Sequence, residues 1–131
     1  MSTAQEDQFE EALLTKVIPS DHAYRKLNRL INFDKIAESL EKTYSHLGQK
    51  GIPAVRGLKA LLLQFWEDYS DREMEAAVRE NLAIRWFCGF SLTDKTPDHS
   101  YFGKFRKRIG TQHFADIFNA INEQLRKEGL F

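Results

Sequence analysis

Four carboxylates close together in the sequence are the first side chains that could do chemistry: Asp68, Asp71, Glu73 and Glu75. Paired carboxylates can hold divalent metal ions for phosphoryl transfer, provided that they converge on one point. The segment from Ser70 to Glu73 is also typical of a capping box, in which serine and glutamate satisfy the first free amides of a helix. The start of a helix therefore explains Asp71 and Glu73, and the sequence favours this structural role over a metal site.

Nucleophilic and metal-ligating side chains are few. The single cysteine, Cys88, lies among aromatic residues, as a buried core thiol would, and it has no partner for an internal disulfide. The histidines have no spacing typical of metal ligands; they are His22, His46, His99 and His113. We therefore expect no catalytic residue and no cofactor in this chain.

The clearest functional signal is a basic stretch behind Pro97. At 100° per residue, a helix over 97–109 would have one apolar and one polar face. The apolar face would carry Phe102, Phe105 and Ile109, and the polar face Ser100, Gly103, Lys104 and Lys107, with His99 and Arg108 on its flanks. Arg106 falls nearer the apolar face, where it would pair with an acid or extend along the surface.

Gly103 is unusual in the middle of a helix, because glycine there costs about 1 kcal/mol relative to alanine. Its lack of a side chain would let another backbone approach the polar face closely. We expect duplex DNA on this face, with Ser100 and Lys104 nearest the bases and phosphates on Lys107, Arg108 and His99. The simpler alternative is the solvated basic face of an ordinary surface helix.

A second basic cluster lies earlier in the chain. Arg25 and Arg29, with Lys26 between them, could grip phosphates beside the main contact. The sequence alone favours the alternative, a surface face balanced by neighbouring carboxylates.

The charges of the chain are balanced in number but unevenly distributed. Nineteen basic residues equal nineteen acidic ones. Residues 1–15 hold four acids and no base, whereas residues 99–110 hold four bases and no acid, with histidine left out of both counts. Because attraction between exposed charges decays within about 10 Å, a local basic segment can bind an anion in a neutral protein.

Length and periodicity define the fold class. A chain of 131 residues, 42% of them hydrophobic, fits a domain with its own core. Helical spacing recurs and strand alternation is absent, which predicts an all-α compact bundle of about six to seven helices. We expect a disordered acidic N-terminus over 1–8 and the domain over 9–131. Neither a membrane span nor a secretory signal is evident, so we expect a cytoplasmic, nucleoid-associated protein.

Capping signals and breaks predict the individual helices. The central helix is expected over 58–69, with Phe65 on its buried face, and the break before it at 48–51. A capped helix over 71–82 followed by that over 97–109 has the order of a helix-turn-helix-like unit, with a longer connection than the standard turn. The expected helix-start caps are Ser20 or Asp21, Asn32 or Asp34, Ser70, Thr96 before Pro97, and Thr111, and the expected left-handed stop is Asn81.

Several blocks, in this order, resemble the N-terminal helical domain of bacterial insertion-sequence transposases of the InsH type. The blocks are IPSDHAYRKL at 18–27, SDREMEAAVR at 70–79, RWFCGFSL at 85–92, PDHS at 97–100 and FRKRIG at 105–110. The resemblance spans about residues 9–131. It implies a helix-turn-helix-like domain that recognises the terminal inverted repeats of a mobile element.

In the family that this chain resembles, the helical domain precedes an RNase H-like domain with an Asp-Asp-Glu triad that binds a divalent metal. None of those acids maps onto this chain. The resemblance therefore implies that this chain binds DNA without catalysing a reaction, and that Mg²⁺ is bound only by the catalytic domain. The chain would then be a truncated frame, one half of a split transposase, or a domain cut at its boundary. The alternative is a protein–protein module that dimerises the transposase, packs on its catalytic domain, or acts as a truncated inhibitor.

Overall fold

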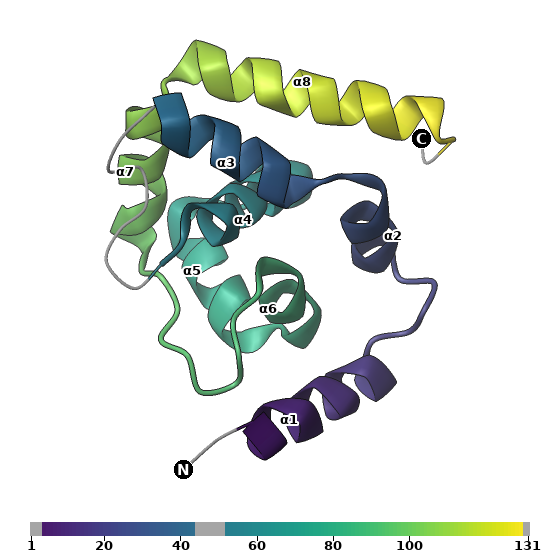
Figure 1. Cartoon of the computed structure of the whole chain (residues 1–131). Helices are drawn as coiled ribbons and strands as arrows, with labels where there is room; N and C mark the ends of the chain where they lie inside the picture. Colours follow the sequence, from purple (N-terminus) through teal and green to yellow (C-terminus); the bar gives the residue numbers. More distant parts are fainter. Residues whose placement is uncertain (1–3, 44–51, 130–131) are drawn as a thin grey trace.

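The computed structural model describes residues 4–43 and 52–129, and across these residues the chain folds into eight α-helices without a β-strand (Figure 1). In chain order they are α1 (Ala4–Val17), α2 (Ala23–Leu30), α3 (Phe33–Thr43), α4 (Ala54–Glu67), α5 (Asp71–Glu80), α6 (Leu82–Cys88), α7 (His99–Ile109) and α8 (Thr111–Lys127). The predicted all-α class is confirmed. Eight helices form rather than six or seven, because both α1 and the short α6 are separate helices. The predicted break at 48–51 and His46 lie outside the described residues.

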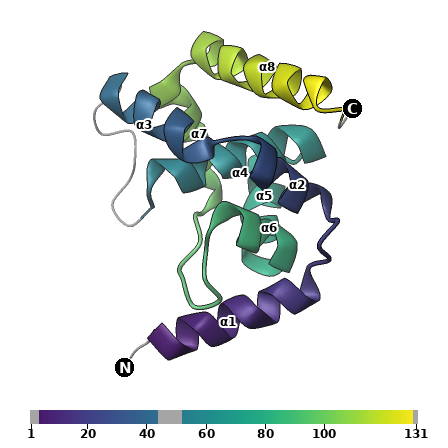
Figure 2. The ribbon, with the colours of Figure 1, turned by 45° about the vertical axis from the view of Figure 1, so that its right-hand side comes forward.

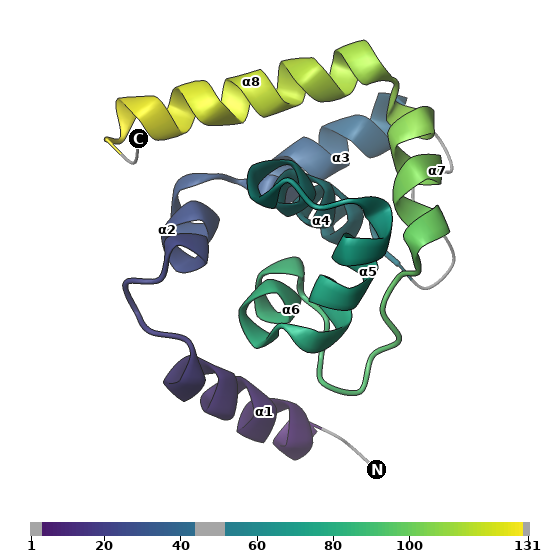
Figure 3. The ribbon, with the colours of Figure 1, turned by 180° about the vertical axis from the view of Figure 1, so that it is seen from behind.

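Helix α4 runs through the middle of the molecule, with α3, α5, α6 and α7 packed around it (Figures 1 and 3). The consecutive residues Ala60 to Leu63 are at most 2% exposed, so α4 is buried on all sides rather than along one stripe. The predicted central helix is confirmed. The predicted burial of Phe65 is wrong: this side chain is 56% exposed, because it packs against α8 on one side only, through Phe114 and Phe118.

The predicted capping box at the start of α5 is confirmed. The Ser70 hydroxyl accepts from the Glu73 amide at 3.1 Å, and the Glu73 carboxylate accepts from the Ser70 amide at 2.8 Å. The predicted left-handed stop at Asn81 is wrong, because Asn81 has an extended backbone with φ −95° and ψ 116°. This residue ends α5 and also begins α6, where its side chain accepts from the Ile84 amide at 3.0 Å.

Three helices begin at other caps than predicted. His22 caps α2 through Nδ1, which accepts from the Tyr24 amide, in place of Ser20 or Asp21. Asp98 caps α7 in place of Thr96, because its carboxylate accepts from two amides of the first turn and suits the positive end of the helix dipole. Thr111 is already inside α8, because the chain turns at Gly110, whose φ of 90° favours glycine. The Asn32 cap of α3 is confirmed by its bond to the Lys35 amide.

Helices α1 and α8 lie at opposite ends of the molecule (Figures 1 and 2). Leu14 on α1 and Ile18 directly after it are buried against the rest of the molecule. The backbone N–H of Leu92 also donates to the carboxylate of Glu10 on α1. Helix α1 begins at Ala4, so residues 4–8, expected to be disordered, are helical. None of the helices within the described ranges combines the length and the apolar character needed to cross a bilayer.

Candidate nucleic-acid interface

Helix α7 presents one basic face to solvent, as its periodicity predicts. Phe102, Phe105 and Ile109 are buried against the core, so the opposite side of α7 lies at the surface. We call this surface the α7 basic face; its exposed members are Ser100, Lys104, Lys107 and Arg108. These four residues come from the same helix surface and include no acid.

The basic end of this face lies toward the C-terminus of α7. Lys104 and Lys107 are exposed, and neither side chain makes a hydrogen bond or an ion pair with another described residue. Arg108 is exposed beside them. Three cations within five residues therefore create a local positive field on a protein of zero net charge.

Arg106 pairs with an acid, as predicted from its position nearer the buried side. Its guanidinium donates to both carboxylate oxygens of Asp71, at 2.9 and 3.0 Å, and to Gln64 at 3.1 Å. The hydrogen bond from Arg106 is the main cause that lowers the pKa of Asp71. This bidentate pair fastens the end of α7 to the start of α5.

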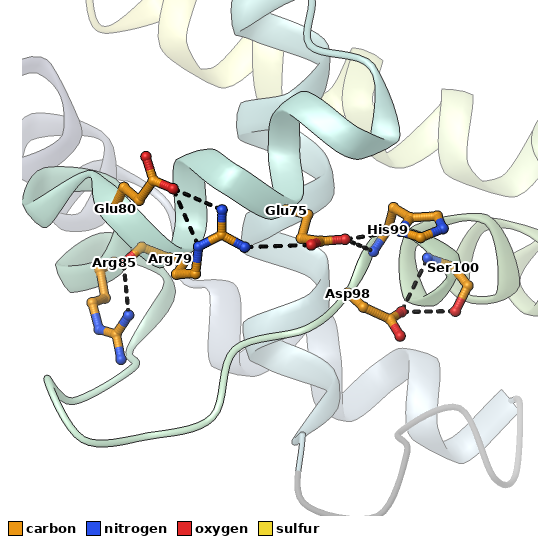
Figure 4. Close-up of polar contacts among 7 residues, drawn as sticks. All are labelled: Glu75, Arg79, Glu80, Arg85, Asp98, His99 and Ser100. Atoms are coloured by element: carbon orange, nitrogen blue, oxygen red, sulfur yellow. Dashed lines mark hydrogen bonds and ion pairs between the residues drawn. The ribbon is translucent and has the colours of Figure 1, made fainter.

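His99 faces α5 rather than the polar side expected for a phosphate contact. Its backbone N–H and its Nδ1 lie 2.7 and 2.9 Å from the same oxygen of Glu75 (Figure 4). The guanidinium of Arg79 also donates to the carboxylate of Glu75 at 3.4 Å. The hydrogen bonds from His99 are the main cause of the lowered pKa of Glu75. His99 thus fastens the start of α7 to α5.

Ser100 is exposed, but its polar groups are engaged by the helix cap. Its hydroxyl donates to Asp98 at 2.7 Å and its amide to the same carboxylate oxygen at 3.0 Å (Figure 4). These bonds lower the pKa of Asp98, with the hydroxyl contribution the largest. A carboxylate therefore marks the N-terminal end of the α7 basic face, and Lys104 lies nearer the cationic end.

Gly103 lies beside α5, at the margin of the α7 basic face. A Cβ added there would lie 3.7 Å from Nη2 of Arg106 and 3.9 Å from a carboxylate oxygen of Asp71. These are ordinary contact distances, so the described protein has room for a side chain at this position.

The second basic cluster is not brought next to α7. Arg25 donates to the carbonyls of Ile18 and Thr15, at 3.1 and 3.4 Å, and lies over the ring of Trp86. It therefore fixes the connection between α1 and α2. Arg29 is exposed on α2, which lies on the opposite side of α4 from α7 (Figures 1 and 3).

Arg85 is a key residue that the sequence reasoning missed. It is only 8% exposed, and its guanidinium donates to four backbone carbonyls, one in α5 and three in the connection between α6 and α7. The acceptors are Arg79 at 3.0 Å, Ser91 at 2.8 Å, Leu92 at 3.2 Å and Asp94 at 2.8 Å. A lone charge between Ile84 and Trp86 was the only sequence signal. Arg85 shapes the segment that leads into α7.

The candidate catalytic groups are otherwise engaged. Burial raises the pKa of Cys88 to about 12, so its thiol stays protonated near neutral pH. Asp71 and Glu73 are held by Arg106 and by the capping box. No three side chains of His, Cys, Asp or Glu converge to hold a metal ion in the described part of the chain, so we assign no residue to a divalent metal.

The fold and this surface define an all-α domain that exposes one basic helix face. The chain matches the family model described as a transposase domain (DUF772) over residues 12–108, and it therefore belongs to that family. The matched range begins within α1 and includes most of α7, so it covers the α7 basic face. Membership supports a role in transposition. No solved structure matches this chain.

Proposed function

We propose that this domain binds double-stranded DNA at the terminal inverted repeats of a mobile element, as the N-terminal part of a transposase similar to the InsH type. The catalytic steps and their divalent metal belong, in this proposal, to a domain outside this chain. The observation that carries the proposal is the α7 basic face, which exposes three cations and no acid. Family membership makes DNA the natural partner for such a face.

The distribution of charge on α7 suggests how the duplex is oriented. A major groove about 12 Å wide admits an α-helix. The carboxylate of Asp98 would repel phosphates at the start of α7. We therefore assign the contacts with the DNA phosphates to Lys107 and Arg108, near the end of the helix. Lys104 lies between the two ends, and in this proposal its side chain contacts a base edge. Phosphate contacts would then supply most of the affinity, and Lys104 the selectivity.

Lys107→Ala is expected to weaken binding to all duplexes and to reduce the slope of log affinity against log salt by about one unit. Lys104→Ala is expected to lower the ratio between the affinity for DNA from the ends of the element and the affinity for scrambled DNA. Fluorescence anisotropy measures both, with one duplex copied from the ends of the element and one scrambled duplex of the same composition. Lys127→Ala, at the far end of α8, removes the same charge and serves as the control.

If Lys104→Ala and Lys107→Ala both leave the two affinities at the value of the Lys127→Ala control, α7 does not contact DNA. Arg29→Ala, measured in the same series, tests whether the α2 cluster grips phosphates separately.

A second candidate function is self-association, and α1 carries the observation that favours it. Phe9, Leu13 and Val17 are 68%, 43% and 57% exposed, and their spacing of four residues places them in one row. A row on a single helix can pair with the same row of a second copy about a two-fold axis. We propose that the exposed apolar row of α1 packs against the same row of a second copy of this chain.

Phe9→Gln combined with Leu13→Gln is expected to convert a dimer into a monomer in sedimentation velocity experiments. Leu14 and Ile18, which attach α1 to the body, remain unchanged, so the helical circular dichroism signal should persist. A native chain that stays monomeric throughout the micromolar range would rule out this interface.

A further inference from the structure

Helices α5 and α7 lie side by side in opposite directions, and side-chain contacts with the first half of α5 fasten α7 near both of its ends. Asp71 at the start of α5 holds Arg106 near the end of α7. Glu75, one turn later on α5, holds His99 at the start of α7 (Figure 4). Met74 and Phe102 fill the core side of the pair and are fully buried. The outer surfaces of the two helices therefore form one continuous surface, which we call the α5–α7 seam.

The helical periodicity places Arg72 on this outer surface. Arg72 lies about 100° around α5 from Asp71, on the side away from buried Met74. Gly103 and Lys107 lie on the outward side of Arg106 around the axis of α7. Because the two helices are antiparallel, this is the same side of the pair on which Arg72 lies outward of Asp71. Asp71 and Arg106 face each other, so Arg72 and Lys107 are expected on the two sides of the seam, offset by only about 3 Å along the helix axes.

The charge of Arg72 is available to a partner. Its side chain is exposed and makes no hydrogen bond or ion pair with another described residue. The acids nearest to it in α5 are already bound: Asp71 by Arg106, Glu73 by the Ser70 amide and Glu75 by His99. Arg79, by contrast, is held by Glu80 at 2.7 Å.

Between these two cations the seam has a position without a side chain. Gly103 is helical and does not have a positive φ, and a Cβ there would make only ordinary contacts with Arg106 and Asp71. The described protein therefore gives no steric reason for glycine, although glycine weakens a helix relative to alanine. A backbone that approaches from outside would supply such a reason.

We propose that one phosphate strand of a DNA duplex crosses the α5–α7 seam at Gly103, with Arg72 and Lys107 as the cations on its two sides. The inference rests on the proposed DNA-binding function and adds α5 to the contact surface. Arg72 thereby becomes a phosphate-binding residue, and Gly103 the point of closest approach.

Arg72→Ala is expected to lower the affinity for specific and scrambled duplexes alike and to reduce the salt slope by about one unit. Gly103→Ala is expected to raise the melting temperature by about 3 °C, through better helix propensity, and yet to weaken DNA binding. The opposite signs of these two effects separate a binding role from a structural one. Anisotropy titrations and thermal denaturation of the full chain measure both, with Lys127→Ala as the matched control.

The outcomes distinguish this inference from the proposed function. If Lys107→Ala weakens binding while Arg72→Ala and Gly103→Ala do not, the seam contact is overturned and DNA binding by α7 stands. If none of the three variants differs from Lys127→Ala, both are overturned. A Gly103→Ala variant that loses stability as well as affinity would overturn the close approach at this position.

Discussion

Arg85→Met is expected to lower the free energy of unfolding by about 3 kcal/mol or more, because hydrogen bonds from a charged donor contribute about 1.5–3 kcal/mol each without being additive. The guanidinium of Arg85 donates to four carbonyls, and three of them, on Ser91, Leu92 and Asp94, belong to the connection between α6 and α7. Methionine fills a similar volume but donates nothing. The connection would lose its main internal support.

Urea denaturation followed by circular dichroism measures this loss. Arg79→Met is the matched control, because Arg79 is exposed and its ion pairs with Glu75 and Glu80 are surface pairs worth about 0–1 kcal/mol. Arg85→Lys should fall between the two, since lysine keeps the charge but lacks the planar fork that reaches several carbonyls. Equal stability of Arg85→Met and Arg79→Met would mean that other contacts hold the connection.

The parts of the fold that depend on helical periodicity were predictable. Burial on α7 follows the 3.6-residue repeat, so its two faces could be derived from the sequence. The dense apolar residues of α4 indicated its central position, although α4 is buried on all sides rather than along one stripe. The same projection placed Arg106 toward a partner, which proved to be Asp71. Caps were less predictable, because neighbouring polar residues compete for the same amides. Asp98 prevails over Thr96 through its carboxylate geometry, which a sequence pattern does not contain.

The candidate site was predictable only where its residues have no distant partner. Lys104 and Lys107 are exposed as expected. His99 and Arg25 are not available as expected, because Glu75 and the carbonyl of Ile18 engage them, and these groups come from other elements. A projection around one helix contains no information about its neighbours. Arg85 was missed for the same reason, since three of its four acceptors are backbone carbonyls of a connection without regular structure.

Gly57→Ala is expected to destabilise the protein by about 2 kcal/mol, the range typical of overpacking in a close-packed core. Gly57 lies on α4 where α7 crosses it. A Cβ there would overlap the hydroxyl of Tyr101 and would lie 2.6 Å from Cε2 of Phe105. Better helix propensity alone would favour alanine by about 1 kcal/mol, so the sign of the change decides between the two effects.

A double-mutant cycle identifies the contact responsible. The Tyr101 hydroxyl is buried and has no hydrogen-bond partner among the described residues, so Tyr101→Phe alone should be neutral or stabilising by about 1 kcal/mol. Because Tyr101→Phe also removes the atom nearest to the new methyl group, Gly57→Ala should cost at least about 1 kcal/mol less in that background. Equal costs in both backgrounds would assign the clash to Phe105. If Gly57→Ala instead raised stability, α4 and α7 would pack with more clearance than these contacts require.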